Sequence, residues 1–580
     1  MKLMLRFMKP YTARIIITVI LKFLAVISEL FIPYTLEYVI DDIAPTKNMK
    51  LVALYGIVMV IFAVMGLFFN VMGNRMATYT SKNAIRNVRS ELFEKTMFLG
   101  GEEFDRASLP SVISRMTSDS YNVQSFLGIV QRMGVRAPIM LLGGIIIAGR
   151  MDISLTLVLL CMIPVLAFII IFISKKGIPM FRKVQGMLDG IVCIMRENIS
   201  GVRVIRALSK HYYEKDRFEK QSDALAESDI KAGMVMALPN PVMTLFLNTG
   251  LTLIILIGAY RVNSGVMKTG VILAFLTYFN MIMQAVMGIN RIFILYSKAG
   301  ASADRIDDLL SIKNSVEDLP EDANDGTDSS KNDESDYAII FDKVSIDKMG
   351  LKDISFKVKK GQSLGIIGST GCGKTTILNL LLRFYDPDSG TISVDGKPVK
   401  YYSRKALRQK FGVVFQNDII FNDTIYENID FGRNLDKKDI EKGAQNAGIA
   451  DYIEGLPDKY QRILAIKGMN LSGGQRQRML VARALAGGSE IIILDDSSSA
   501  LDYRTDARLR ENLKKNYPHV TKVMIAQRVS SVRDMNSIIV MDKGRIIGYG
   551  DHESLMENCE TYRETYNMQM GEEMCNAANQ

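Results

Sequence analysis

The sequence contains no tryptophan, and only five of its 580 residues are cysteine. The cysteines show no paired metal-ligand spacing, which argues against a zinc-type site, and unpaired thiols suit a reducing cytoplasm. They are Cys161, Cys193, Cys372, Cys559 and Cys575. No cleavable signal peptide is expected either, because the first apolar run is too long and follows an amphipathic start. Lys2, Arg6 and Lys9 precede that run.

Long apolar runs are concentrated in the first half of the chain. The mean hydropathy is positive and 48% of the residues are hydrophobic, which predicts a membrane region joined to a soluble domain. About 20 apolar residues are needed to cross a bilayer as a helix. Six runs meet or approach this length: Ile15–Ile40, Leu51–Gly73, Gly134–Ala148, Ser154–Ile173, Met243–Tyr260 and Val271–Met287.

Basic residues predict the orientation of these spans. Lysine and arginine favour the cytoplasmic side, and they are dense in the loops after the second and fourth runs. Both termini and the soluble domain are therefore expected in the cytoplasm. The formal charge of +9 is explained mainly by these loops, so nucleic-acid binding is not expected. An acidic stretch, Glu317–Asp336, is interpreted as a solvated tether, with a regulatory role as the alternative.

A glycine-rich turn lies between the apolar run Ser363 to Ile367 and the helix-like segment Thr376 to Phe384. Glycines let consecutive N–H groups turn toward phosphate oxygens, and a helix N-terminus adds partial positive charge. This context predicts a P-loop, with a purely structural glycine turn as the alternative. The residues expected to bind phosphate are Gly368, Ser369, Thr370, Gly371, Cys372, Gly373, Lys374, Thr375 and Thr376.

Two further motifs follow in the second half. Leu471–Arg478 opens a predicted helix whose N-terminus offers N–H donors. The residues at that N-terminus are Ser472, Gly473, Gly474 and Gln475. The apolar run Ile491–Leu494 ends in Asp495, which predicts a buried strand that presents a carboxylate to magnesium.

With Gln416 and the segment Ser499–Asp502, these motifs resemble, in their order, those of ATP-binding cassette (ABC) proteins. Leu471–Arg478 carries the most specific part of the resemblance, because it is similar to the family's signature motif. The resemblance implies that Ser472, Gly473, Gly474 and Gln475 bind ATP held by the P-loop of another cassette. The resemblance covers essentially the whole chain and implies an ABC-type ATPase coupled to transport. The cofactors that it implies are ATP and Mg²⁺. The metal ligands that it implies are Thr375, Gln416 and Asp495.

The fold implied is an N-terminal six-helix transmembrane domain of the type I/type IV ABC exporter fold, fused to a C-terminal α/β P-loop nucleotide-binding domain. The expected boundaries are 1–312 for the transmembrane domain, 313–336 for the acidic linker and 337–580 for the nucleotide-binding domain. Two segments of the basic loops, Ser114–Asp119 and Glu197–Ile205, resemble the coupling segments of ABC exporters.

Departures from the family pattern fall on the hydrolytic groups. Asp496 stands where the family has the glutamate that activates water, and Gln527 stands where it has a histidine. Asp496 is one methylene shorter than glutamate, and Gln527 cannot carry a positive charge near neutral pH. A displacement of about 1 Å at a reacting group can cost on the order of a hundredfold in rate, so slow hydrolysis is expected here. Lys348 also replaces the aromatic residue expected before the first cassette strand pair, which weakens adenine stacking.

The pattern therefore resembles the degenerate-site subunit of a heterodimeric multidrug-type ABC exporter in the cytoplasmic (inner) membrane. Asp496, Gln527 and Gln416 are the expected catalytic positions of its impaired site. The expected partners are a second half-transporter, the lipid bilayer and a small amphipathic substrate. Several alternatives remain: drift in a symmetric homodimer, a siderophore-like importer with the exporter fold, a lipid or peptide transporter, and a nucleotide sensor without transport.

Substrate identity is the least determined property. Methionines in or near the last two spans predict an adaptable cavity, with lipid-facing packing as the alternative. They are Met236, Met243, Met281, Met283 and Met287. Ionisable residues within spans are costly and often functional, which singles out Lys22, Glu29 and Arg291. Lys22 and Glu29 are seven residues apart and share one helix face, although Lys22 could instead snorkel to the interface.

Overall fold

The computed structural model describes residues 2–313, 336–497 and 501–578. Most of the predicted acidic linker, and Ser499 and Ala500, lie outside these residues. The chain divides into two units, each described here by itself. One comprises Met1–Phe98 with Ala107–Ile312, and the other comprises Leu99–Arg106 with Lys313–Gln580.

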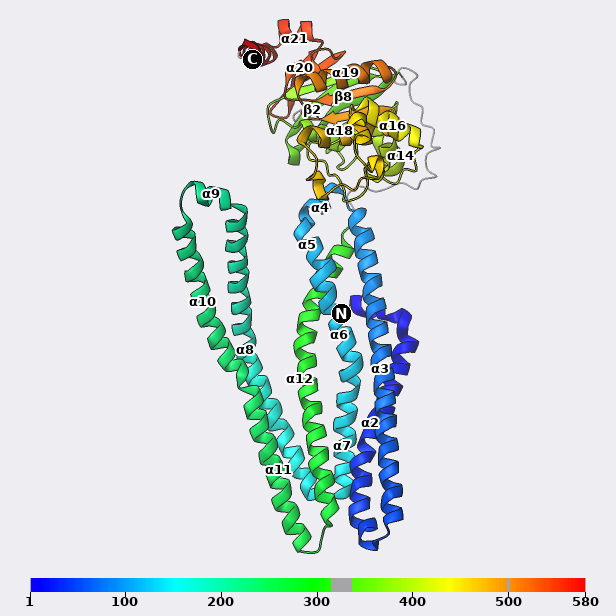
Figure 1. The fold of residues 1–580 in the computed structure, drawn as a ribbon, viewed down its shortest axis with the longest axis vertical. Helices are drawn as coiled ribbons and strands as arrows, with labels where there is room; N and C mark the ends of the chain where they lie inside the picture. Colours follow the sequence, from blue (N-terminus) through cyan, green and yellow to red (C-terminus); the bar gives the residue numbers. More distant parts are fainter. Residues whose placement is uncertain (1, 314–335, 498–500, 579–580) are drawn as a thin grey trace. The chain divides into compact units, whose positions relative to one another are not determined.

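The first unit is helical, and its described residues contain six helices long and apolar enough to cross a membrane. This confirms the six spans predicted from the sequence. Figure 1 shows most of them as long rods that run roughly side by side. The main helices are α1 (Lys2–Met8), α2 (Thr12–Tyr38), α3 (Met49–Met97), α5 (Leu109–Ser114), α6 (Ser120–Ile129), α7 (Val135–Met151), α8 (Ile153–Ser200), α9 (Val202–Ala207), α10 (His211–Ala237), α11 (Pro239–Asn263) and α12 (Thr269–Ser311).

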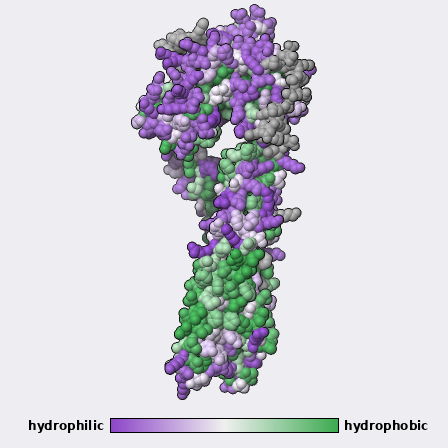
Figure 2. Space-filling model, turned by 90° about the vertical axis from the view of Figure 1, so that its right-hand side faces the viewer, coloured by the Kyte–Doolittle hydropathy of each residue, from purple (hydrophilic) through white to green (hydrophobic). Residues whose placement is uncertain are grey.

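Two of the long helices begin at side-chain caps. Asn48 Oδ1 accepts hydrogen bonds from the N–H groups of Lys50 and Leu51 at the start of α3, and Asp152 caps α8 in the same way. Such caps satisfy N–H groups that have no partner inside the helix. The outward side chains of α3 are apolar and exposed, for example Val60 and Leu67. Figure 2 shows the resulting hydrophobic band on this unit, as expected for a surface that contacts lipid.

Three single π-helical turns interrupt two of the spans, Leu3–Thr46 and Leu109–Met151. They are η2 (Val39–Ile43), η4 (Arg115–Asp119) and η5 (Val130–Gly134). Such turns re-aim side chains and are frequent at functional sites. η4 contains most of the predicted coupling segment Ser114–Asp119.

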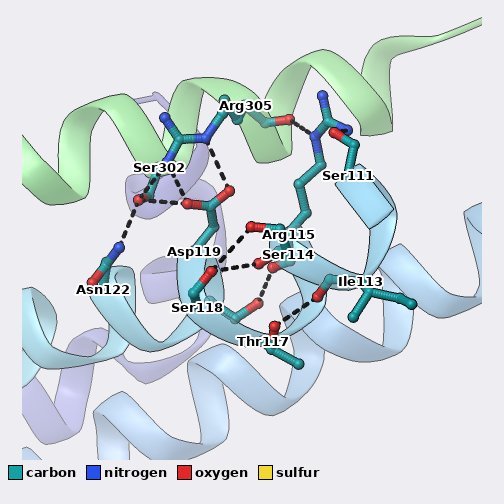
Figure 3. Close-up of polar contacts among 11 residues, drawn as sticks. Ser111, Ile113, Ser114, Arg115, Thr117, Ser118, Asp119, Asn122, Ser302 and Arg305 are labelled. Atoms are coloured by element: carbon teal, nitrogen blue, oxygen red, sulfur yellow. Dashed lines mark hydrogen bonds and ion pairs between the residues drawn. The ribbon is translucent and has the colours of Figure 1, made fainter. Parts of the chain in front are cut away.

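A polar network joins η4 to α12 (Figure 3). Asp119 is buried and accepts hydrogen bonds from Arg305 Nε at 3.0 Å and from the Ser302 hydroxyl at 2.8 Å. Arg115 donates to the backbone oxygen of Arg305 at 2.8 Å, and Asn122 donates to Ser302 at 3.0 Å. The network therefore fixes the segment that follows α5 against the last helix of the same unit.

The second unit contains two sheets. One is a four-stranded antiparallel sheet in the order β2-β1-β4-β5, and the other is six-stranded in the order β10-β9-β3-β8-β7-β6. In the larger sheet all neighbouring pairs are parallel except β10 with β9. The strands are β1 (Tyr337–Ile346), β2 (Leu351–Lys359), β3 (Ser363–Gly368), β4 (Ser389–Val394), β5 (Lys397–Pro398), β6 (Phe411–Val414), β7 (Ile491–Asp495), β8 (Thr521–Ile525), β9 (Ser537–Asp542) and β10 (Arg545–Gly550).

Helices cover this sheet, and the core lies on both of its faces. Along β7, Ile491 and Ile493 pack into one hydrophobic cluster, whereas Ile492 and Leu494 pack into the other. Burial on both faces explains why the strand is a continuous apolar run. The helices are α4 (Gly101–Ala107), α13 (Lys374–Leu381), α14 (Arg404–Gln409), α15 (Ile425–Asp430), α16 (Lys437–Asn446), α17 (Ala450–Glu454), α18 (Gly473–Ala486), α19 (Tyr503–Asn516), α20 (Val529–Val532), α21 (His552–Asn558) and α22 (Glu560–Ala578).

Candidate functional site

Three neighbouring parallel strands end at the same edge of the larger sheet. β3 leads into the P-loop, β7 ends at Asp495, and β8, which lies between them, leads to Gln527. Two backbone hydrogen bonds fix these ends: Ala526 N–H to Ile366 O at 3.1 Å and Asp496 N–H to Ile525 O at 2.9 Å. Ligands of such sheets bind beyond the carboxyl ends of the strands, so this edge is the candidate site.

The P-loop has the backbone that its glycines predict. Gly371 and Gly373 have φ angles of +82° and +102°, which side chains with a Cβ rarely adopt. A Cβ on Gly368 would lie 2.3 Å from the backbone oxygen of Met541, so only glycine fits there. The Lys374 ammonium donates to the carbonyls of Gly368 at 2.7 Å and Ser369 at 2.8 Å. These neutral acceptors leave its positive charge available to phosphate.

Asp495 and Thr375 form an oxygen pair suited to magnesium. The Thr375 hydroxyl donates to Asp495 Oδ2 at 3.3 Å, and Asp495 is 2% exposed. Burial raises the pKa of this carboxyl, and Asp496 beside it adds to the rise. Asp495 forms no ion pair within the described residues. Magnesium in nucleotide sites often takes one or two protein oxygens and completes its shell with phosphate and water, so these residues fit it.

Asp496 lies between two amide side chains. Its Oδ2 accepts a hydrogen bond from Gln527 Nε2 at 3.1 Å and a longer one from Gln416 Nε2 at 3.5 Å. The backbone of Asp496 is left-handed, with φ +49°, a conformation that aspartate tolerates better than most residues. Burial raises the pKa of its carboxyl, while the Gln416 hydrogen bond opposes this rise. The structure thus brings together all three predicted catalytic positions.

These groups line one cavity of about 180 Å³, and the signature residues are not among its lining. The lining residues predicted from the sequence are Thr370, Gly371, Gly373, Lys374, Thr375, Thr376, Gln416, Asp495, Asp496 and Gln527. Ser472 instead caps α18, where its hydroxyl accepts from Gln475 N–H at 3.2 Å and Gln475 Oε1 accepts from Ser472 N–H at 2.9 Å. This capping box confirms the predicted helix start and leaves Ser472 and Gly473 exposed.

Gln477, on the same helix, connects the signature helix to the P-loop cavity. Its side-chain Nε2 donates to the backbone oxygen of Asp496 at 3.2 Å. The signature helix α18 therefore contacts the lining of the cavity through Gln477.

Lys348 lies elsewhere than predicted. The sequence placed it before the first strand pair, whereas it lies in the 3₁₀ turn η7 (Asp347–Met349) between β1 and β2. Its ammonium forms an ion pair with Glu102 at 2.5 Å. The placement was wrong because β1 starts at Tyr337, ahead of the segment in which the sequence motif was sought.

Sequence analysis missed the segment that contains Glu102. Residues Leu99–Arg106 belong to the second unit, although they are far from it in sequence. Asp105 accepts from the Tyr385 hydroxyl at 2.7 Å, and Gly101 N–H donates to Phe384 O at 3.1 Å. Burial, with Asp105 beside it, raises the pKa of Tyr385 to about 12. Acidic residues in an otherwise basic loop were the signal that could have found this segment.

The candidate residues of the transmembrane unit have separate partners. Lys22 is buried against two asparagines of α3, and Glu29 pairs with Arg136 at 2.7 Å. The side chain of Arg291 lies outside the described residues. Met243, Met283 and Met287 line one cavity of about 230 Å³, Met281 lines another, and Met236 is exposed.

Family models match both units of the chain. The model described as the ABC transporter transmembrane region matches residues 15–286, and the model described as ABC transporter matches residues 351–499. These matches agree with the helical span and with the P-loop to β7 region described above.

Full-length relatives and a solved structure extend these matches. The chain is 32% identical to the uncharacterized ABC transporter ATP-binding protein YfiB of Bacillus subtilis, over 98% of each chain. It is 26% identical to the ATP-dependent lipid A-core flippase of Syntrophus aciditrophicus, covering 99% of this chain and 95% of that protein. A bacterial Atm1-family ABC exporter with ATP bound has a TM-score of 0.80 at 23% identity, covering 96% and 98% of the two chains. This last likeness shows the exporter fold.

Proposed function

Because the chain belongs to the ABC transporter family, we propose that it is one half of a heterodimeric exporter whose two ATP sites are unequal. Its own P-loop site mostly binds ATP, and its signature motif completes the hydrolytic site of a second half-transporter. The transported compounds are amphipathic. The relative named a lipid A-core flippase supports a lipid-like substrate of this kind.

The observation that carries the proposal is the environment of Asp496. A general base must reach the attacking water and accept its proton. The Asp496 carboxylate is instead bonded to the Gln527 amide, and it is one methylene shorter than glutamate. Gln527 can donate a hydrogen bond to phosphate but adds no charge there. Lys374 and the expected magnesium ligands Thr375 and Asp495 are present. The site therefore keeps its groups for binding ATP, while Asp496 and Gln527 are less suited to hydrolysis.

Two exposed surfaces of this chain support the presence of a second subunit. Ser472 and Gly473 are exposed at the N-terminus of α18 and do not line the chain's own P-loop cavity. The tip formed by α9 also exposes apolar side chains, and clustered exposed apolar residues mark interaction sites. They are Ile199, Val202, Val204 and Leu208.

In this proposal, ATP bound between Lys374 of this chain and the signature of the partner draws the two cassettes together. At the other site, the helix N-terminus at Ser472 contacts ATP held by the P-loop of the partner, which draws the cassettes together in the same way. Magnesium neutralises phosphate charge and would be held by Thr375 and Asp495. Closing and opening of the cassettes shifts the membrane units between two access states. Both termini and the ATPase unit lie in the cytoplasm, as the basic loops indicate.

A pair of substitutions tests the assignment of the two sites. In the purified complex, Ser472→Ala should lower ATPase activity on the order of a hundredfold, because a donor at the hydrolytic site is lost. Asp496→Ala should lower it by less than about twofold, because little hydrolysis depends on this residue. The activity is measured as steady-state phosphate release. The opposite order of effects would refute the proposal.

Ser403→Ala is the matched control for the loss of a helix cap. Ser403 caps α14 through Ala406 N–H at 3.3 Å, as Ser472 caps α18, but it lies outside the P-loop cavity and the signature. Its substitution should leave the ATPase activity close to that of the unmodified complex.

A nucleotide sensor without transport is the second candidate function, favoured by the same weakened site. Nucleotide-dependent binding of a partner without substrate flux would favour it over transport.

A further inference from the structure

The transmembrane unit contains a cavity of about 490 Å³ with three cationic side chains in its lining. Lys22 comes from α2, Arg132 from η5 and Arg136 from α7. Asn70 and Asn74 of α3 line the same space. Charged side chains inside membrane spans are costly and are usually retained for a function.

Lys22 is held by neutral groups. Its side chain is 1% exposed, and its ammonium donates to Asn70 Oδ1 at 2.6 Å and to Asn74 Oδ1 at 2.7 Å. A Cβ on Gly73 would lie 3.1 Å from Lys22 Cε, so a glycine provides the space for the lysine stem to cross α3. Amide oxygens satisfy the donors of an ammonium without cancelling its charge.

The two guanidinium groups differ in their partners. Arg132 Nε donates to the backbone oxygen of Gly128 at 3.1 Å, and no carboxylate pairs with Arg132 within the described part of the chain. Arg136 pairs with Glu29 at 2.7 Å. Among the described residues, none that lines the cavity is acidic. Guanidinium groups stay protonated in proteins, so the cavity carries an excess of positive charge in a region of low dielectric.

The remaining wall suits an apolar group. Met133, Met140 and Met281 line it, and flexible, polarizable methionine side chains adapt to ligands of varied shape. Arg132 and Met133 both lie in the π turn η5, and both line the cavity.

We infer that this cavity binds an amphipathic anion, with its phosphate or carboxylate among Lys22, Arg132 and Arg136 and its apolar part against the methionines. The site narrows the proposed amphipathic substrate to an anionic one, and its role as a transport site rests on the proposed function. Two sources could supply such a ligand: an anionic lipid of the bilayer, or a soluble anion with an alkyl chain.

Binding can be measured without transport. The complex, purified with its co-purifying subunit, is placed in phosphatidylcholine nanodiscs, and binding of radiolabelled decyl phosphate is followed by scintillation proximity without ATP. Saturable binding is expected, with competition by unlabelled decanoate but not by decyltrimethylammonium or inorganic phosphate. Equal competition by decyltrimethylammonium would overturn the inference, because the two ligands share the alkyl chain and differ in charge.

Arg132→Gln is the most informative variant, because removal of the Arg132 guanidinium leaves no carboxylate without its ion-pair partner. Loss of one charged hydrogen-bond partner should weaken decyl phosphate binding about tenfold or more. Arg150→Gln is the matched control, since Arg150 is exposed at the far end of α7 and does not line the cavity. It should leave the affinity unchanged. Equal affinity of the Arg132→Gln and unmodified complexes, with the same gel-filtration profile, would overturn the inference.

Two further experiments address separate questions. The first identifies the source of the ligand, and the second tests whether the site serves transport. If an anionic lipid is the natural ligand, nanodiscs of phosphatidylglycerol should suppress decyl phosphate binding; if a soluble anion is, binding should persist. Both results support an anion site. ATP-driven uptake of decyl phosphate into proteoliposomes then tests transport separately. Binding without uptake would contradict the proposed function while leaving the anion site in place.

Discussion

At the residue scale, the P-loop site combines retained binding groups with altered hydrolytic ones. Lys374 and Thr375 present the ammonium and the hydroxyl that are expected to bind phosphate and magnesium, while the Asp496 carboxylate accepts a hydrogen bond from the Gln527 amide. Both altered side chains are smaller or less charged than the groups they replace. Their mutual hydrogen bond holds the carboxylate just beyond the end of β7, so the slow hydrolysis that we propose does not require a disordered site.

Alkylation of the Cys372 thiol tests whether ATP binds at this site. Its thiol is 2% exposed and lies 3.7 Å from the Lys374 ammonium, so an added acetamide group would displace the lysine or the loop. Carbamidomethylation of Cys372 should therefore weaken ATP binding on the order of tenfold or more, since it disturbs a charge-assisted contact. ATP should slow the modification. Photolabelling of this chain with 8-azido-ATP reports binding, and mass spectrometry reports the modified fraction.

Cys372→Ala supplies the control for that experiment. It should bind nucleotide and be insensitive to the reagent, which separates Cys372 from the exposed Cys161 and Cys193. Unchanged photolabelling after complete modification of Cys372 would contradict the prediction.

At the element scale, the Asp119 network joins η4 to α12. Asp119 is 3% exposed, whereas the Arg305 side chain is 50% exposed and can be rehydrated. Breaking a fully buried ion pair costs about 3–5 kcal/mol, and exposed pairs contribute about 0–1 kcal/mol. The half-exposed pair lies between these limits, and its two neighbours, Ser302 and Asn122, keep part of the network.

Asp119→Asn should therefore destabilise the transmembrane unit by about 1–3 kcal/mol. This loss should lower the melting temperature by several degrees, which can be measured by fluorescence-detected gel filtration after heating. Asp216→Asn is the control, because Asp216 pairs with Lys220 on the exposed surface of α10. Surface substitutions of this kind usually stay within about 0.5 kcal/mol. Equal melting of the two variants would contradict a stabilising role for the network.

The elements also show what the sequence could and could not predict. The P-loop, the strand ending at Asp495 and the cap at Ser472 were predictable because each depends on residues close together in the chain. The Asp496–Gln527 contact depends on β7 and β8 pairing with each other, and the cavity at Lys22 depends on α2, α3, η5, α7 and α12 meeting. Such long-range contacts leave no local pattern, and single π turns have no periodicity from which to predict them.

At the scale of the whole molecule, the two halves of the nucleotide machinery face different surroundings. Most of the P-loop residues line one cavity, while the signature residues lie outside it at an exposed helix start. Figure 1 shows α8, α9 and α10 extending away from the other helices of their unit, and the apolar tip at α9 is exposed. The proposed dimer would cover both the exposed start of α18 and the tip at α9. Gln477 joins the signature helix to the P-loop side, because its Nε2 donates to the backbone oxygen of Asp496.

The identity of the second subunit is the prediction on which the asymmetric mechanism depends. Gentle purification of the tagged chain from its native membrane should recover a different half-transporter in a one-to-one ratio, measured by mass spectrometry of the intact complex. The partner should carry glutamate and histidine at the positions that correspond to Asp496 and Gln527, because otherwise both sites would lack a general base. A homodimer of this chain would contradict the mechanism. Two weakened sites would then favour nucleotide sensing over transport.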